Sequence, residues 1–408
     1  SADIIALTTL VAASNNISGF EAVRTTDALD AAMVIASDVQ STGITSFTTP
    51  GSNANDNAAI TMAAGDMTVN LSASLAGTLT ITDTGTATTD SVTINNTALV
   101  ADDMGDAEAI TINGYETATI VANSVGGVTS QDFAALTMAV DTGGASVLNI
   151  TGNSPMTTTG TTGIATIDAS GMTGEGVGTA TFTMGGVGTG ATTITGSPGR
   201  DTLLAANTAT TLNGGAGNDV LTGGTAGDTI NGGDGIDTID TGAGALATTV
   251  DTVDGGAGND VITVGQGTST IDGGAGDDSI NMAATLSTGD VISGGEGTDT
   301  IRLNASPTAA TAGQVSGFER VQLDLNTGTV NFATMGANAG FTTATASAAT
   351  TTFSNATATV AQLELDGGAD TLVTFTRLVD GTTDTLDIET TAAETIADLS
   401  ILMKRLSQ

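Results

Sequence analysis

A nine-residue pattern of glycine and aspartate recurs in the middle of the chain. Its clearest copies are GGAGNDVLT at 214–222, GGDGIDTID at 232–240, GGAGNDVIT at 255–263 and GGAGDDSIN at 273–281. Each copy has paired glycines, a carboxylate at its sixth position and a large aliphatic residue at its eighth. Carboxylate and carbonyl oxygens are the ligands that Ca²⁺ prefers, and glycine lets a turn aim its carbonyls at an ion. The pattern therefore predicts calcium sites built from turns.

The sixth positions fall into one register along residues 196–302. This register needs five inserted residues between Thr241 and Ala245 and three between Met282 and Asp290. Two nonapeptides make one coil of a parallel roll, so residues one coil apart stack at a strand spacing of ~4.8 Å. Alternate sixth positions then lie on opposite edges of the roll. The residues in this register are Asp201, Thr210, Asp219, Asp228, Asp237, Asp251, Asp260, Ser269, Asp278, Asp290 and Asp299.

The two edges differ in their turn sequences. One edge has turns such as GGAGND and GGEGTD, and we expect a nearly unbroken column of about five Ca²⁺ ions there. The other has degraded turns such as AANTAT and VGQGTS, together with both insertions, so we expect few ions. The expected ligands on the first edge are Asp201, Asp219, Asp237, Asp260, Asp278 and Asp299 with the turn glycines Gly214, Gly215, Gly217, Gly232, Gly233, Gly235, Gly255, Gly256, Gly258, Gly273, Gly274, Gly276, Gly294, Gly295 and Gly297. Asp228, Asp251 and Asp290 are the candidates on the second edge.

The eighth positions support the same register, because all of them are aliphatic. They are Leu203, Leu212, Leu221, Ile230, Ile239, Val253, Ile262, Ile271, Ile280, Ile292 and Ile301. Burying each side chain stabilises the roll by about 2 kcal/mol. Without an ion, stacked carboxylates repel by roughly 3 kcal/mol per pair at an effective dielectric near 20. We therefore expect calcium binding and folding to be coupled.

These turns resemble the RTX family, whose calcium-binding nonapeptide has the form GGxGxDxUx with U a large aliphatic residue. The resemblance covers residues 196–302, about a quarter of the chain. It implies a calcium-binding β-roll that stays unfolded in the cytoplasm, leaves the cell by type I secretion and folds outside. Family members usually carry an uncleaved secretion signal near the C-terminus, which the tail of this chain could represent.

The composition narrows the classes of fold and function. Acidic residues outnumber basic ones by 44 to 7, giving a formal net charge of −37, so we expect no nucleic-acid partner. With 56 glycines and 2% aromatic residues, a repeat architecture is favoured over a wide globular core. An acidic chain with few aromatics can also be disordered, but the regular aliphatic spacing argues against disorder. No apolar run is long enough for a membrane span, so no membrane insertion is expected.

The residues that common hydrolytic sites need are missing. The chain has no His and no Cys, which excludes Ser-His-Asp and Cys-His sites and the zincin motif. Acidic pairs such as Asp102 and Asp103 could act as acid and base, but carboxylates occur throughout this sequence. We therefore expect that the protein is not an enzyme.

The flanking regions, residues 1–195 and 303–408, predict further strands. Short alternating phrases such as SVTIN at 91–95 and SVLNITG at 146–152 lie between Gly, Asn and Asp residues, as in short strands joined by tight turns. Helical patterns are predicted at 27–39 and 130–140, and residues 391–406 predict an amphipathic C-terminal helix. The expected fold is all-β, an elongated parallel β-solenoid with a calcium β-roll segment and few short helices.

A second repeat lies partly outside the glycine-rich block. ISGFEAV at 17–23, INGYETA at 112–118 and VSGFERV at 315–321 share an aliphatic residue, a glycine, an aromatic and a glutamate. We interpret each as a turn whose aromatic residue fills the core. The glutamate could be a metal ligand, although only its charge suggests it. The first and third copies align over a longer stretch, as if the chain began just after another nonapeptide block.

Two functions remain open. The Thr- and Ala-rich flanks resemble calcium-dependent surface-layer (S-layer) proteins of Gram-negative bacteria, which implies a secreted, extracellular protein that self-assembles at the cell surface. The alternative is the ligand-binding region of a large RTX adhesin, with a cell-surface polysaccharide as the possible partner. A ladder of outward threonines at the seventh position, Thr211, Thr229, Thr252 and Thr270, is the candidate binding face.

Overall fold

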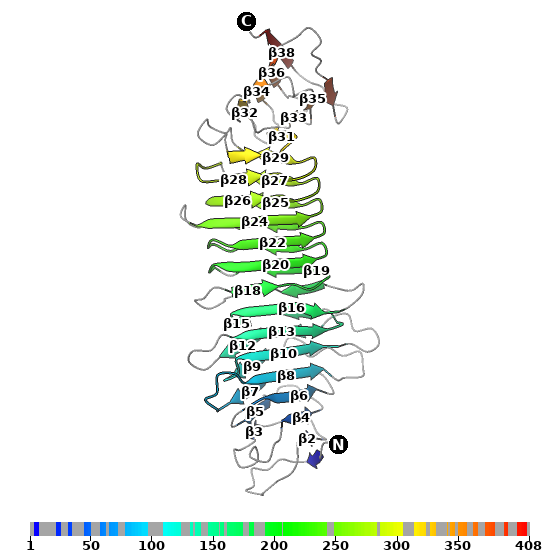
Figure 1. Ribbon diagram of the computed structural model, residues 1–408, viewed down its shortest axis with the longest axis vertical. Coiled ribbons are helices and arrows are strands. Elements are labelled where there is room, and N and C mark those ends of the chain that lie inside the picture. Colours follow the sequence, from blue (N-terminus) through cyan, green and yellow to red (C-terminus); the bar gives the residue numbers. More distant parts are fainter. Residues whose placement is uncertain are drawn as a thin grey trace. The chain divides into compact units, whose positions relative to one another are not determined.

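The computed structural model describes a chain built from parallel β-strands (Figure 1). It describes residues 4–7, 22–25, 32–34, 45–49, 58–62, 65–71, 78–96, 109–123, 131–133, 135–139, 146–154, 156–158, 161–173, 179–182, 192–205, 207–242, 249–283, 286–304, 314–323, 327–331, 341, 343–346, 350–356, 362–365, 372–379, 387–390 and 398–405. Within these ranges every named element is a strand, and every strand pair whose register is defined is parallel. The predicted parallel β-solenoid is confirmed.

The strands form because their residues alternate between inward aliphatic and outward polar side chains. In β10 (Thr117–Ala122), Ala118, Ile120 and Ala122 are fully buried, and the residues between them are partly exposed. Threonine and β-branched residues suit such a half-buried pleated surface. Each coil lays its apolar row directly on that of the next, as in Ile120↔Ile150 between β10 and β13 (Val147–Gly152).

The first compact unit contains residues 1–220. One sheet has the order β1 (Ile4–Leu7), β2 (Ala22–Thr25), β4 (Ser46–Thr49), β6 (Met67–Leu71), β8 (Ser91–Asn96), β10, β13, β16 (Thr166–Met172), β18 (Thr192–Thr195) and β20 (Thr210–Ala216). A second has the order β15 (Thr161–Thr162), β12 (Ala135–Ala139), β9 (Ala109–Asn113), β7 (Leu79–Asp83), β5 (Ala58–Met62) and β3 (Ala32–Val34), and a third contains β11 (Gln131–Phe133), β14 (Met156–Thr158), β17 (Thr179–Phe182) and β19 (Arg200–Leu204). Strand β21 (Val220–Thr222) lies at the unit boundary.

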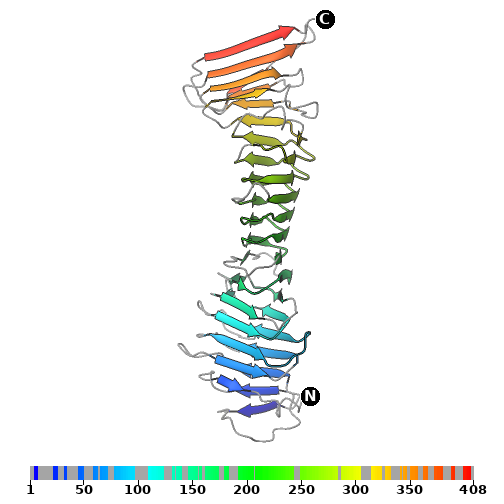
Figure 2. The same ribbon diagram turned by 90° about the vertical axis from the view of Figure 1, so that its left-hand side faces the viewer.

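The second unit contains residues 221–408. Its even-numbered sheet has the order β22 (Thr229–Asp234), β24 (Val250–Ala257), β26 (Thr268–Asp272), β28 (Val291–Ser293) and β30 (Val315–Ser316). Its odd-numbered sheet has the order β23 (Thr238–Asp240), β25 (Val261–Val264), β27 (Ser279–Met282), β29 (Thr300–Leu303), β31 (Arg320–Leu323), β33 (Thr343–Ala346), β35 (Gln362–Leu365) and β37 (Asp387–Thr390). A further sheet stacks β32 (Thr327–Asn331), β34 (Thr350–Ala356), β36 (Leu372–Val379) and β38 (Asp398–Arg405), drawn in orange to red in Figure 2.

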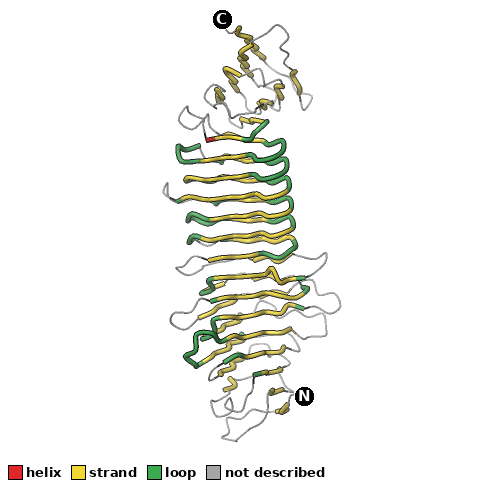
Figure 3. Tube along the Cα trace, in the orientation of Figure 1, coloured by secondary structure: helices red, strands yellow, loops and turns green. Residues whose placement is uncertain are grey.

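Turns connect the even- and odd-numbered strands at both edges of the second unit's roll, and Figure 3 shows them as green segments. We call the turns before the odd-numbered strands the odd edge and those before the even-numbered strands the even edge. The eleven predicted eighth-position residues, from Leu203 to Ile301, are all buried, with exposed fractions of 2% or less. This row forms the core of the glycine-rich block, and the predicted inward phase is confirmed.

The helix predictions are wrong wherever the structure describes the residues. Residues 130–140 contain strands β11 and β12, in which Leu136 and Met138 are buried two positions apart, as a strand requires. Within 27–39 the described residues form strand β3. The tail residues from Asp398 to Arg405 form strand β38, which pairs with β36 over its whole length. The open edge of a neighbouring strand supplies hydrogen-bond partners for the backbone N–H and C=O groups of each segment. This tertiary pairing overrides the local helical periodicity.

The aromatic residues of the second repeat lie where they were predicted. Tyr115 and Phe318 are fully buried, each after a glycine with positive φ, Gly114 at 79° and Gly317 at 72°. The first copy, at 17–23, lies almost entirely outside the described residues. The predicted domain boundaries at 195/196 and 302/303 stay predictions.

Candidate metal centre

The sixth position of the nonapeptide is buried in every copy, although it is polar. All eleven residues in the predicted register have exposed fractions of 3% or less. They fall on two edges, because Asp237, Asp260, Asp278 and Asp299 precede odd-numbered strands, whereas Asp228, Asp251, Ser269 and Asp290 precede or begin even-numbered ones. The predicted register is confirmed, and calcium binding by these residues stays a prediction. Buried carboxylates are rare unless they are paired or coordinate a metal.

On the odd edge, hydrogen bonds join aspartates of successive coils. The backbone N–H of Asp237 donates to Oδ1 of Asp260 at 2.8 Å, and that of Asp260 donates to Oδ1 of Asp278 at 2.7 Å. The N–H of Asp278 donates to Oδ1 of Asp299 at 2.8 Å. In the first unit, the N–H of Asp201 donates to Oδ1 of Asp219 at 2.7 Å. One oxygen of each carboxyl therefore fixes the side chain against the neighbouring coil.

The second carboxyl oxygen is different. Oδ2 of Asp260, Asp278 and Asp299 is buried and accepts no hydrogen bond from the described residues. An ionised oxygen that has lost its water and gained no donor costs several kcal/mol. A cation beside this row of oxygens removes that cost, because it supplies the positive charge that the chain does not.

The first glycine of each turn brings a carbonyl oxygen to the same place. A Cβ atom on Gly255 would lie 2.7 Å from Oδ2 of Asp260 and still closer to the carbonyl oxygen of Gly273 in the next coil. The same two kinds of oxygen surround Gly273, where Asp278 and Gly294 supply them. Any side chain at this first position would fill the space in which the oxygens converge.

The second and fourth glycines have another role. Gly256 and Gly258 have φ values of 104° and 138°, a conformation that residues with a Cβ rarely adopt. The corresponding glycines of the other GGxG turns, Gly215, Gly217, Gly233, Gly235, Gly274, Gly276, Gly295 and Gly297, also have positive φ. The first position, by contrast, is glycine because of close approach, which the prediction from φ alone had missed.

These donors fit calcium. They are all oxygens, and they combine carboxylates from successive coils with backbone carbonyls, as calcium sites in proteins do. Within the described part of the chain, no group of three or more His, Cys, Asp or Glu side chains suited to a metal is present. That finding agrees with the arrangement of the odd edge, since each coil adds only one carboxylate and the other oxygens belong to the backbone.

Burial changes the proton affinity of the same carboxyls. Burial, and then the charges of neighbouring aspartates, raise the pKa of Asp260 and Asp299 to about 6, against 3.8 ordinarily. Burial also raises the pKa of Asp251 and Asp278. Without a cation these groups hold their protons more strongly, which is the behaviour expected of desolvated ligands that share a column.

The even edge leaves fewer oxygens open. Oδ2 of Asp290 accepts the backbone N–H of Ser287 at 2.6 Å, and Oδ2 of Asp228 accepts that of Gly224 at 2.7 Å. Ser269 offers a hydroxyl where the odd edge has a carboxylate. Two even-edge oxygens, Oδ2 of Asp251 and the hydroxyl Oγ of Ser269, are buried without a hydrogen-bond partner in the described residues, and only the first belongs to a carboxylate. The geometry therefore favours the odd edge for ions, in agreement with the predicted asymmetry.

The first residue of the predicted ion column, Asp201 in the first unit, differs from the prediction. Both carboxyl oxygens of Asp201 accept hydrogen bonds from Ser197, its N–H at 2.5 Å and its Oγ at 3.0 and 3.1 Å. Ser197 stands where the other turns have glycine, so the first predicted ligand is already satisfied by its own turn.

Glu319, which only its charge had suggested as a ligand, continues the odd edge beyond Asp299. The N–H of Asp299 donates to Oε2 of Glu319 at 2.9 Å, as each earlier aspartate donates to the next. The carbonyl oxygen of Gly317 approaches Gly294 just as that of Gly294 approaches Gly273. The glutamate of the VSGFER turn was the only sequence signal for this extension.

Comparison with known families supports this centre. A family model described as RTX calcium-binding nonapeptide repeat (4 copies) matches residues 187–221, 205–239, 222–245, 248–281 and 287–305. No curated protein sequence matches the chain at a significant level. A search of the described residues for a helix able to cross a membrane finds none.

Proposed function

Residues 187–305 carry RTX calcium-binding nonapeptide repeats, and from this premise we propose that the chain is a secreted, non-enzymatic structural protein. Calcium ions bound along the odd edge link its successive coils, and the folded protein assembles with copies of itself at the bacterial cell surface. The observation that carries the proposal is the row of buried carboxyl oxygens on Asp260, Asp278 and Asp299 that accept no hydrogen bond from the described residues.

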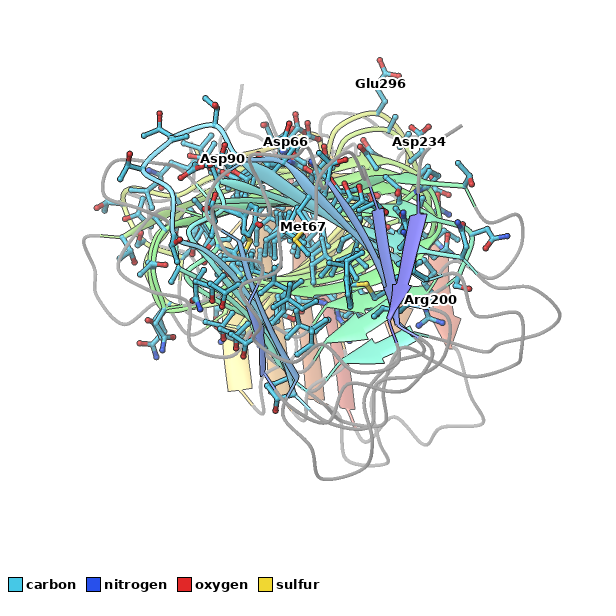
Figure 4. All side chains as sticks on the ribbon, turned by 90° about the horizontal axis from the view of Figure 1, so that it is seen from below. Asp66, Met67, Asp90, Arg200, Asp234 and Glu296 are labelled. Atoms are coloured by element: carbon cyan, nitrogen blue, oxygen red, sulfur yellow. The ribbon has the colours of Figure 1, made fainter. Side chains whose placement is uncertain are left out.

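The charge of the chain supports the link between calcium and assembly. At a net charge of −37, copies repel one another, and divalent cations reduce this repulsion. The turns also present acidic side chains outward: Asp234 and Glu296, at the third position of their turns, are exposed (Figure 4). Export by a type I apparatus belongs to the same proposal, because RTX repeat proteins are typically secreted.

Electron microscopy of the purified chain tests assembly. In millimolar calcium we expect ordered sheets or filaments, and after addition of a calcium chelator we expect them to disperse. A magnesium-only sample controls for general neutralisation of charge. Monodisperse monomers at millimolar calcium would contradict self-assembly while leaving calcium binding intact.

One observation favours a second function, that of an adhesin. Thr229, Thr252 and Thr270 are exposed and lie in register across β22, β24 and β26, so their hydroxyls form a regular outward ladder. Such a ladder suits a repetitive polar ligand such as a polysaccharide. A glycan array, together with a thermal-hysteresis measurement for ice, separates the two functions: specific binding that Thr252→Val weakens supports the adhesin.

A further inference from the structure

Two buried carboxylates of the first unit lie one coil apart, outside the nonapeptide block. Asp90 directly precedes β8 and Glu116 directly precedes β10, and these strands pair in register as Ser91↔Thr117. The exposed fractions are 7% for Asp90 and 6% for Glu116. Neither residue belongs to a GGxGxD turn. Polar groups buried to this degree are normally satisfied by hydrogen bonds or by an ion.

The backbone around this pair reproduces the arrangement at the end of the odd edge. The N–H groups of Glu116 and Thr117 donate to the carbonyl of Asp90 at 3.1 and 3.3 Å, and the N–H of Asp90 donates to Oε2 of Glu116 at 3.1 Å.

At the odd edge, the N–H groups of Glu319 and Arg320 donate to the carbonyl of Asp299 at 3.2 and 2.9 Å. The N–H of Asp299 donates to Oε2 of Glu319. The hydrogen bonds between Glu116 and Asp90 are therefore equivalent to those between Glu319 and Asp299.

The remaining carboxyl oxygens lack hydrogen-bond partners, as the Oδ2 atoms of the nonapeptide aspartates do. Oδ2 of Asp90 and Oε1 of Glu116 are buried and accept no hydrogen bond from the described residues. The carboxyl of Asp83, at the end of β7, is buried and shares a side-chain hydrogen bond with that of Asp90, which leaves Oδ2 of Asp90 without a partner. Its oxygens are held by the N–H groups of Gly85 at 2.6 Å and Gly65 at 3.3 Å.

A nearby acidic residue has no such unpartnered oxygen. Asp66 lies at the same edge of the first unit (Figure 4), but it is exposed. Its Oδ1 accepts the N–H and Oγ of Ser91 at 2.9 and 2.8 Å. Asp66 is thus solvated and hydrogen-bonded, whereas Oδ2 of Asp90 and Oε1 of Glu116 are buried and have no hydrogen-bond partner in the described residues.

We propose that Asp90 and Glu116 form a further calcium site, in the first unit and outside the RTX repeats, with Asp83 adding negative charge beside it. Like the nonapeptide sites, it combines one carboxylate from each of two successive coils. An oxygen-only donor set selects a hard divalent cation such as Ca²⁺. The ion holds the coils of β8 and β10 together, as the predicted ions do on the odd edge.

The chain contains a built-in probe for this site. Tyr115 is the only tyrosine, and there is no tryptophan. Its ring is fully buried next to Glu116, and it lies close enough to Asp83 and Asp90 that their charges, after burial, raise the pKa of its hydroxyl. Tb³⁺ replaces Ca²⁺ in oxygen sites. Tyrosine that absorbs light transfers energy to a nearby Tb³⁺ ion, and the resulting Tb³⁺ emission falls steeply as the distance between them grows.

The test is Tb³⁺ luminescence of the full chain, excited in the tyrosine absorption band. We expect sensitised emission that calcium competes away and that disappears in Tyr115→Phe. In Asp90→Asn and Glu116→Gln we expect Tb³⁺ to bind at least about tenfold more weakly. Asp168→Asn is the matched control, because Asp168 is partly exposed in β16 and its Oδ1 already accepts the N–H and Oγ of Ser170, so emission should not change.

Far-UV circular dichroism of each variant shows whether it is folded. If one of the two variants does not fold, the other still decides, because each removes one ligand without changing side-chain shape. Absence of sensitised emission from the folded wild-type chain overturns the proposal, as does unchanged emission from a folded Glu116→Gln or Asp90→Asn variant. The outcome is independent of assembly and of the nonapeptide sites, neither of which contributes a tyrosine.

Discussion

At the scale of single residues, each aspartate of the odd edge has two roles that its two oxygens divide between them. Oδ1 of Asp260 accepts the N–H of Asp237 and fixes the coil, whereas Oδ2 is buried without a donor. An amide side chain keeps the first role and loses the second. The two roles can therefore be separated by substitution to asparagine, which has nearly the same shape.

The first prediction is that Asp260→Asn changes stability in opposite directions with and without calcium. In calcium, the melting temperature should fall, because the ion loses a charged ligand and its affinity drops at least about tenfold. In chelator, it should stay equal or rise, since a desolvated, mutually repelling charge is gone. Thermal unfolding by circular dichroism measures both.

The matched control for that substitution is Asp254→Asn. Asp254 is exposed in β24 of the same coil stack and its charge is the smallest of the influences on the pKa of Asp260, so its replacement should change stability by no more than ~0.5 kcal/mol. Equal destabilisation of both variants in calcium would mean that general charge, and not ligation, determines the effect.

The second prediction concerns pH. The pKa of Asp260 and of Asp299 is about 6 in the folded chain, above the ordinary 3.8, so between these values the folded state binds more protons than the unfolded state. Unfolding free energy without calcium must then fall as pH rises through this window. We expect a higher melting temperature near pH 5 than near pH 7.5 in chelator.

Calcium should reverse this dependence, because it competes with the same protons. Below about pH 6 its apparent affinity should weaken, which a calcium titration at several pH values measures. A melting temperature in chelator that rises with pH would contradict the raised pKa values.

At the scale of elements, the turn determines where the ligands lie, and glycine enters it for two reasons. Gly258 needs a positive φ, whereas Gly255 needs the space beside Oδ2 of Asp260. Turns on neighbouring coils are also joined directly, since the N–H of Gly258 donates to the carbonyl of Ala275 at 2.8 Å. A strained turn would therefore disturb the coils on both sides of it.

The third prediction is that Gly258→Ala destabilises the roll in calcium and in chelator alike. A Cβ there would clash with the carbonyl oxygen of Gly235 and force an unfavourable φ, for which we expect a loss of about 1–3 kcal/mol or more. Chemical denaturation measures it. Ala257→Ser, at the neighbouring exposed position, is the control and should be nearly neutral, so a comparable loss there would contradict the argument from φ.

At the scale of the whole molecule, charge and folding are connected. Compact folding of a chain of 408 residues with a net charge of −37 brings like charges together and is opposed by their repulsion. The stacked carboxylates increase this repulsion locally. Ions that bind only the folded state stabilise it by mass action. Calcium concentration should thus decide whether the nonapeptide block is folded, which suits the proposed export of the unfolded chain.

The fourth prediction is a count. We expect more ions on the odd edge than on the even edge, because Asp228 and Asp290 already use Oδ2 for backbone N–H groups. Anomalous scattering from crystals grown in calcium locates the ions, and isothermal titration gives their number. Equal occupancy of both edges would refute the asymmetry.

The sequence by itself determined the register of the roll, its inward aliphatic row and the residue types of the predicted calcium sites. Periodicity carries that information, because a nonapeptide that repeats in phase places equivalent residues at equivalent positions. Ile262 and Ile280, for example, pair directly across β25 and β27. Local chemistry was therefore enough to predict the positions of the turns and of the buried carboxylates.

Only the tertiary structure decided what depends on neighbouring coils. The helical patterns at 130–140 and in the tail became strands because an adjacent strand edge was open to each. The second repeat already aligned Glu116 with Glu319, but only the structure showed that each accepts a hydrogen bond from an aspartate one coil earlier. Asp90 and Glu116 are separated by 26 residues and share no repeat phase, so no local pattern could have paired them.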